Sequence, residues 1–185
     1  MPKTMSVTEA RDNFPALVRQ VAGRDEPVVV TSRNRPQVVI VRWETYQHER
    51  DLQVEGARHR LETLVTQMGQ LAGGMREAYA PDSLDLVQGT GDLLALARRA
   101  WVVCRSLDKP RRHLASALAD GLLNLVEGGR KLTLEQLDRM LATLPLLGRG
   151  DLTAEEVAAA DLALAEAGLD SVLPIGDELA SQRWR

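Results

Sequence analysis

Arginine side chains lie in the middle of the most apolar segment of the chain, and their chemistry suits a negatively charged ligand. Residues 28–46 read VVVTSRNRPQVVIVRWETY, in which two runs of β-branched residues flank a short polar break. The break contains Arg33, Asn34 and Arg35. A guanidinium group binds phosphate oxygens and pairs with guanine in the major groove of DNA, and an asparagine amide pairs with adenine. The break is therefore either a solvated hairpin tip or a contact to nucleic acid.

Other basic residues near the N-terminus extend this candidate site. Arg11 falls in the first turn or so of an expected helix, where free backbone N–H groups also favour phosphate. Lys3 adds a further candidate phosphate contact. For Arg19 and Arg24 a solvated surface is the better interpretation, and Arg42 is expected to serve the junction with the next helix.

Residue types that perform catalysis are present but scattered. His48, His59 and His113 do not have the spacing of metal ligands. Cys104 lies in an apolar stripe, where a buried small hydrophobe is the expected role. The stretch QGTGD lacks the lysine and the strand–helix frame of a phosphate-binding loop. We predict no catalytic residue, no metal site and no cofactor, and hence a protein that is not an enzyme.

Charge is distributed unevenly along the chain of 185 residues. Residues 1–42 hold seven Lys or Arg and four Asp or Glu, a net charge of +3. Residues 51–185 hold 15 basic and 20 acidic residues, a net charge of −5. Such an asymmetry indicates different partners for the two parts.

Membrane and oxidising compartments are disfavoured by the same sequence. Cys104 is the only cysteine, so no intrachain disulfide can form. No apolar run approaches the roughly 20 residues that span a bilayer, and the N-terminus lacks the apolar core of a signal peptide. We expect a cytoplasmic protein that makes no membrane contact.

The elements that must position the arginines are short strands and one helix. Strands are expected at 3–7, 27–32 and 37–42, and a helix with a bend at Pro15 is expected between the first two. Ser6-x-x-Glu9 has the spacing of a capping box. The second and third strands are apolar at nearly every position, which is typical of strands buried on both faces. A unit of about 45 residues cannot easily bury two faces alone, so a second copy of the chain is expected to cover it.

From Trp43 onward the apolar period becomes helical. Between 54 and 75 it indicates either the seam of two paired helices or one stripe of a helical bundle. Glycines at 73–74 and 88–91 are expected to end or interrupt helices, with further helices at 92–107 and 110–127. Residues 132–148 align with 152–168, each opened by a capping box, and the tail from 170 is expected to be extended or a short turn. The apolar stripe consists of Val54, Ala57, Leu61, Leu64, Met68, Leu71 and Met75.

The predicted fold class is α+β: a β-α-β-β unit at 1–52, followed by an all-α region at 53–185. MSVTEARDNFPALVRQV, then PVVVTSRNRPQVVIV, then WETYQ resemble the Phd/YefM family of type II antitoxins over about residues 3–52. The resemblance implies a homodimer that binds operator double-stranded DNA, represses its own operon and neutralises a protein toxin. The chain departs from the family in its Arg-Asn-Arg-Pro hairpin tip and in its long helical region, which stands where the family has a short tail.

The resemblance also assigns roles to particular residues. It implies DNA contacts for Arg11 and the hairpin arginines, Arg33 most nearly, which join Lys3 and Asn34 as candidates. Toxin contacts are expected within residues 43–80. The candidates there are Trp43, Tyr46, Leu52, Leu61, Leu64 and Met68.

Two functions from different classes stay open for the helical region. In the first it binds a toxin, and its acidic bias suits an RNA-cleaving toxin with a basic active site. In the second the chain is a free-standing transcriptional regulator, in which the helical region mediates dimerisation or senses a ligand and no toxin exists.

Overall fold

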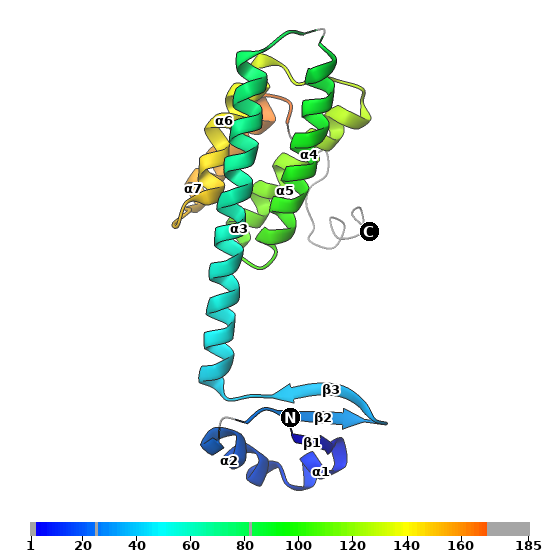
Figure 1. Ribbon diagram of the computed structural model, residues 1–185. Helices are drawn as coiled ribbons and strands as arrows, with labels where there is room; N and C mark the ends of the chain where they lie inside the picture. Colours follow the sequence, from blue (N-terminus) through cyan, green and yellow to red (C-terminus); the bar gives the residue numbers. More distant parts are fainter. Residues whose placement is uncertain (1–2, 25, 82, 170–185) are drawn as a thin grey trace. The chain divides into compact units, whose positions relative to one another are not determined.

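The computed structural model describes residues 3–24, 26–81 and 83–169, and its internal contacts divide the chain into two units (Figure 1). The first unit ends at Gln53 and the second begins at Val54. A short three-stranded sheet with helices is followed by an all-α region, so the predicted α+β class is confirmed. Within the described ranges, no helix has the length and apolarity required to cross a membrane.

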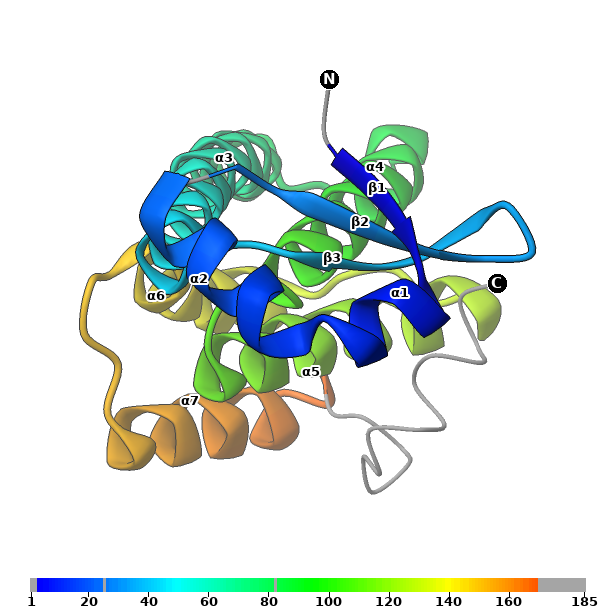
Figure 2. The same cartoon turned by 90° about the horizontal axis from the view of Figure 1, so that it is seen from below.

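The N-terminal unit is a sheet with two short helices on one face (Figure 2). β1 pairs in parallel with β2, and β2 pairs antiparallel with β3, in the order β1-β2-β3. The helices α1 and α2 connect the two parallel strands. The elements are β1 (Lys3–Ser6), α1 (Val7–Asp12), α2 (Phe14–Arg24), β2 (Val28–Ser32), β3 (Arg35–Ile40) and the start of α3 (Trp43–Glu77).

The expected single helix with a bend is in fact two helices. The capping box that opens α1 is present, because the Ser6 hydroxyl accepts from the Glu9 N–H and the Glu9 carboxylate accepts from the Ser6 N–H. Asn13 then ends α1, and its carbonyl accepts the first bonds of α2 from Ala16 and Leu17. Pro15 stands in the first turn of α2, where its missing N–H leaves no bond unmade.

The core of this unit is small and lies between the sheet and its two helices. Val28 and Val30 of β2 are buried against it, whereas β3 is largely uncovered. Val38 is 58% and Val39 54% exposed, so the expected burial of this strand on both faces is not reached within one chain. Phe14, the first residue of α2, is likewise 54% exposed. The core residues are Ala10, Leu17, Val21, Val28 and Val30, with Met5 and Ile40 at its margin.

The second unit is a bundle of helices from one chain. The apolar stripe of α3 packs within it, which favours the bundle alternative over a seam between two paired helices. Leu61 and Met68 are fully buried, and Leu64 and Leu71 pack against the same core. The remaining helices are α4 (Leu84–Cys104), α5 (Lys109–Glu127), α6 (Leu134–Gly148) and α7 (Ala154–Glu166).

Glycines at 73–74 and 88–91 were expected to end or interrupt helices, and this expectation is wrong. α3 continues through Gly73 and Gly74, and α4 already begins at Leu84. A Cβ atom on Gly89 would stand 2.7 Å from the Met75 sulfur, so the glycine allows α3 and α4 to approach closely. The neighbouring Thr90 is buried and donates its hydroxyl proton to the Leu86 carbonyl at 2.7 Å.

The duplicated segment forms α6 and α7, each opened by the expected capping box at Thr133 and Thr153. Both helices pack against the central helix α5. Leu114, Leu118 and Leu122 are at most 1% exposed, as expected for residues of a helix at the middle of the bundle. The tail from residue 170 lies outside the described residues.

The first turn of α5 contains a buried arginine that bonds one carboxylate and two backbone carbonyl groups. Arg111 pairs with the N-cap residue Asp108 and donates to the carbonyl groups of Arg149 and Gly150. These bonds connect the start of α5 to the α6–α7 loop. Burial lowers the pKa of Arg111, yet the carboxylate and carbonyl partners keep the guanidinium satisfied.

We expect Gly121→Ala to destabilise the chain by about 1–3 kcal/mol or more, because overpacking forces backbone shifts. The new Cβ would stand 2.5 Å from the Leu169 carbonyl oxygen, where the chain leaves α7 and returns to α5. Gly91→Ala is the matched control, since its Cβ meets nothing within 4 Å. That variant should be more stable by up to about 1 kcal/mol. Urea unfolding followed by circular dichroism measures both, and equal stabilities would contradict the close approach.

Candidate nucleic-acid interface

The β2–β3 hairpin closes with a two-residue turn of mirror-image geometry. Arg33 and Asn34 both have positive φ, at 50° and 60°, and Ser32 pairs with Arg35 across the turn. Positive φ at both central residues defines the type I′ turn, whose twist matches that of the flanking strands. Asn tolerates this conformation and glycine prefers it, so an arginine here is unusual.

Arg33 therefore occupies a position at which local backbone preference favours another residue. The left-handed region costs a residue with a Cβ about 1–2 kcal/mol. Strain of this kind is frequently found where a side chain serves a purpose other than folding. The turn places the guanidinium group at the end of the hairpin. A glycine at this position would fit the backbone better but would carry no cationic side chain.

The hairpin also has a local irregularity close to its tip. The pairing shifts between Val30 and Thr31, so that Val30 pairs with Val38 while Thr31 pairs with Pro36. Gln37 is thereby left as an extra residue in β3, which is a β-bulge. Pro36 is tolerated because β3 is an edge strand.

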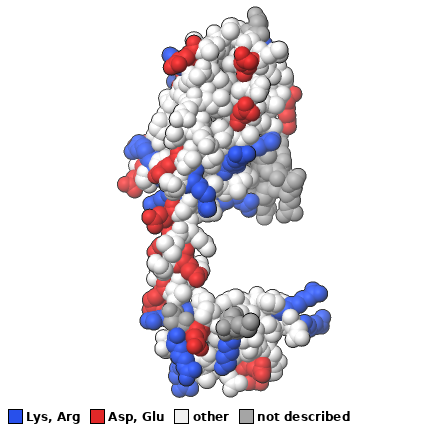
Figure 3. All heavy atoms as spheres, in the orientation of Figure 1, with Lys and Arg blue, Asp and Glu red and all other residues white. Residues whose placement is uncertain are grey.

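The polar side chains at this tip are exposed to solvent. Arg33, Asn34 and Arg35 are exposed, and no ion pair joins either arginine to another residue within the described ranges. Figure 3 shows Lys and Arg side chains projecting from the end of the hairpin that carries the turn. The arrangement can offer two guanidinium groups and an amide to a phosphate backbone or to base edges.

Arg11 is placed differently from the expectation. It lies in the last turn of the six-residue helix α1, and the N-terminus of that helix is occupied by the Glu9 carboxylate. Hydrogen bonds from the Ser6 backbone and hydroxyl lower the pKa of Glu9. The helix-terminus argument for phosphate therefore fails for Arg11. Its side chain is 76% exposed and pairs through Nε with Asp12 at 3.0 Å, an exposed contact that is weak.

Lys3 and Arg42 have local partners on the same unit. The Lys3 ammonium group donates to the side-chain carbonyl of Gln20 at 2.9 Å, which leaves its charge uncompensated. Arg42 pairs with Glu44 in the first turn of α3 at 2.9 Å. Arg42 thus contacts the helix junction, as its position in the sequence led us to expect.

The residues proposed to meet a protein partner fall into two groups. Trp43, Tyr46 and Leu52 are 62%, 44% and 54% exposed on the first turns of α3, and the two aromatic rings are 5.6 Å apart. Leu61 and Met68 are buried in the bundle core. Because their side chains already pack in this core, they do not offer a surface to a partner.

Leu64 belongs with the second group, since it is partly buried against the bundle core. Candidates that the sequence reasoning missed are the exposed apolar residues Val7 and Val18, at 49% and 46%. Their exposure follows from the size of the unit, because two short helices on a small sheet cannot bury every apolar residue that they carry.

A cluster of potential metal ligands is not formed by the described residues. No group of three or more His, Cys, Asp or Glu side chains converges among residues 3–24, 26–81 and 83–169. Cys104 is fully buried, and burial raises the pKa of its thiol to about 12. A thiol with that pKa stays protonated and unreactive at neutral pH.

A family comparison agrees with the arrangement of the N-terminal unit. Residues 2–63 match the family model described as antitoxin Phd_YefM of type II toxin–antitoxin systems. The match includes the strained hairpin, α1 and α2, and the exposed first turns of α3. No curated protein and no solved structure matched the chain. The helical region beyond residue 63 therefore lies outside the matched family model.

Proposed function

We propose that this chain is an antitoxin that binds operator DNA as a homodimer and neutralises a partner toxin through its C-terminal region. The observation that carries the proposal is the antitoxin family match over residues 2–63, a range that contains the exposed arginine hairpin. The matched family is one of antitoxins and not of enzymes. Residues 1–52 are assigned to dimerisation and DNA binding, and residues 53–185, together with the first turns of α3 that precede them, to partner interaction.

The proposed DNA contact is made by the hairpin tip. Arg33 and Arg35 are exposed cations at a tight two-residue turn, and Asn34 adds an amide that suits adenine. A two-fold dimer would present two such tips, which suits a palindromic operator. Lys3 and Arg11 are assigned phosphate contacts, since both keep exposed cationic groups on the same small unit.

The proposed dimer explains the apolar surface that the N-terminal unit leaves open. Val38 and Val39 are more than half exposed on neighbouring positions of the edge strand β3. Unpaired edge strands with apolar side chains readily associate with another chain. A second copy is the partner that the family match supports.

The proposed toxin contact begins at the first turns of α3. Trp43, Tyr46 and Leu52 are large, exposed and within the family match, and aromatic residues are common anchors at protein interfaces. The net charge of −5 over residues 51–185 would attract a basic partner.

A second candidate function is favoured by the folded bundle. Its core already holds Leu61 and Met68, so the region is not a short tail that folds onto a toxin. A free-standing transcriptional regulator with a helical dimerisation or ligand-sensing domain would use such a bundle without any toxin.

For DNA binding, we expect Arg33→Gly to weaken operator affinity by roughly 1–3 kcal/mol while the fold stays intact. Relief of the left-handed strain offsets the added chain entropy of glycine, so the stability should be unchanged or slightly higher. Arg19→Ala is the control, because it removes one exposed positive charge from α2. Gel-shift titration of the promoter fragment at fixed salt measures the affinities. Equal losses of operator affinity in the two variants would mean that Arg33 contributes only a positive charge and makes no specific contact.

For dimerisation, Val39→Lys should lower the molar mass of the purified chain from dimer to monomer. The residue is exposed in a single copy, so the substitution should leave the fold itself unaffected. Burying a lysine in an apolar interface is unfavourable. Sedimentation equilibrium measures the mass, with Gln37→Lys on the same strand as control. An unchanged dimer would exclude this edge as the interface.

For the toxin, co-expression with a small basic open reading frame beside the gene is the direct test. We expect that neighbour to be toxic alone and to co-purify with this chain. Trp43→Ala should weaken the complex by about 2 kcal/mol or more, as truncation of an interface anchor does. Leu162→Ala is the control, since Leu162 is 61% exposed on α7. A promoter-binding protein with no toxic neighbour would favour the regulator.

A further inference from the structure

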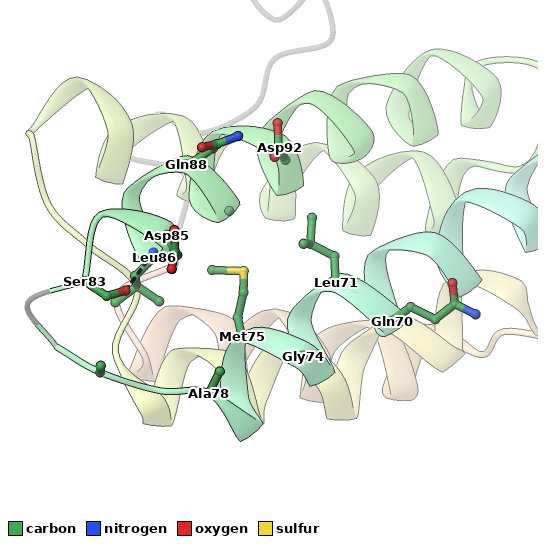
Figure 4. A pocket seen from close by; sticks show the side chains of 12 residues that line it. Gln70, Leu71, Gly74, Met75, Ala78, Ser83, Asp85, Leu86, Gln88 and Asp92 are labelled. Atoms are coloured by element: carbon green, nitrogen blue, oxygen red, sulfur yellow. Dashed lines mark hydrogen bonds between the residues drawn. The ribbon is translucent and has the colours of Figure 1, made fainter.

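A groove in the helical unit lies between the end of α3 and the start of α4 (Figure 4). Its volume is about 540 Å³, within the roughly 300–1,000 Å³ of small-molecule pockets. The antitoxin family match ends at Thr63 within α3, and the groove residues begin beyond it at Gln70.

The floor of the groove is apolar and is opened by small residues. Leu71, Met75 and Leu86 line it together with Gly74 and Gly89. The Met75 side chain extends from α3 into the space between the helices, where Gly89 leaves room for its sulfur. A methionine thioether adapts its shape to different apolar ligands.

The wall formed by α4 is acidic. Asp85, Gln88 and Asp92 follow one another at steps of three and four residues, which places them along one face of the helix. Gln70 adds an amide from α3. The twelve residues that line the groove include two carboxylates and no lysine or arginine.

The carboxylates of the groove have no cation of their own among the described residues. Neither Asp85 nor Asp92 takes part in an ion pair there. Of the cations near the groove, Arg76 pairs with Asp138, and the Lys131 ammonium group donates to the Pro81 carbonyl at 3.1 Å and not to either carboxylate. The groove thus combines an apolar floor with uncompensated negative charge.

We propose that this groove binds a small amphipathic organic cation, an amine carried on an apolar body such as an arylalkylamine. The ammonium group lies against the face of α4 that carries Asp85, Gln88 and Asp92, where the two carboxylates attract it and the amide oxygen of Gln88 accepts a hydrogen bond. The apolar body lies on Met75, Leu71 and Leu86. This site goes beyond the proposed antitoxin activity, and its test uses neither DNA nor toxin, so each can fail without the other.

The test uses three probes that share one apolar body and differ in charge: phenylbutylamine, phenylbutanol and phenylbutanoate. Each is titrated into the full chain carrying ¹³C-methyl methionine. We expect a saturable shift of the Met75 methyl signal with the amine, weaker binding of the alcohol and weakest binding of the carboxylate. Added salt should weaken amine binding, since the rim carboxylates are exposed. The signals of Met5 and Met140 serve as internal references.

Substitutions separate the two parts of the site. Asp85→Asn and Asp92→Asn should each weaken amine binding about three- to fivefold, with Glu135→Gln in the first turn of α6 as control. Gly74→Leu should fill the groove and abolish binding, whereas Gly56→Leu on the same helix should not; neither Cβ meets a neighbour within 4 Å. No saturable Met75 shift, or equal affinity for all three probes, would overturn the proposal.

Discussion

The limited ability of a 53-residue unit to cover its own sheet is the constraint on which the N-terminal part of this protein depends. A unit of this size buries only about 60% of the surface that its unfolded chain exposes. Here α1 and α2 cover β2, while Val38 and Val39 of the edge strand stay more than half exposed. The apolar runs of the sequence thus encode more buried surface than one chain provides. Self-association would complete the core and duplicate the hairpin in the same step.

The long helix α3 changes environment along its length. Its first turns carry the exposed pair Trp43 and Tyr46, whereas from Ala57 onward its apolar stripe is buried in the bundle. An isolated helix of about 11 residues is marginal in water, because nucleation is costly. Continuity with the buried part provides the nucleus from which the exposed turns can propagate. The bundle thereby contributes to the helical state of a segment that it does not itself cover.

Local signals in the sequence predicted most of the elements. The capping boxes at Ser6, Thr133 and Thr153 and the apolar period of α3 depend on neighbours within one or two turns, so they are readable without tertiary knowledge. The role of Gly89 depends instead on Met75 of another helix. The left-handed backbone at Arg33 escaped prediction for a different reason, since a favourable turn sequence would have contained glycine. The acidic groove required two helices to be placed side by side, and no local pattern encodes it.

Cys104, the single cysteine, is closed off inside the bundle, where burial keeps its thiol protonated. While the bundle stays folded, two copies of the chain therefore cannot be locked together by an intersubunit disulfide. Any assembly of folded copies is governed by mass action and dissociates on dilution. Subunits can then exchange between assemblies. If a dimer binds a two-fold symmetric site, the occupancy of that site would increase more than linearly with the concentration of the chain.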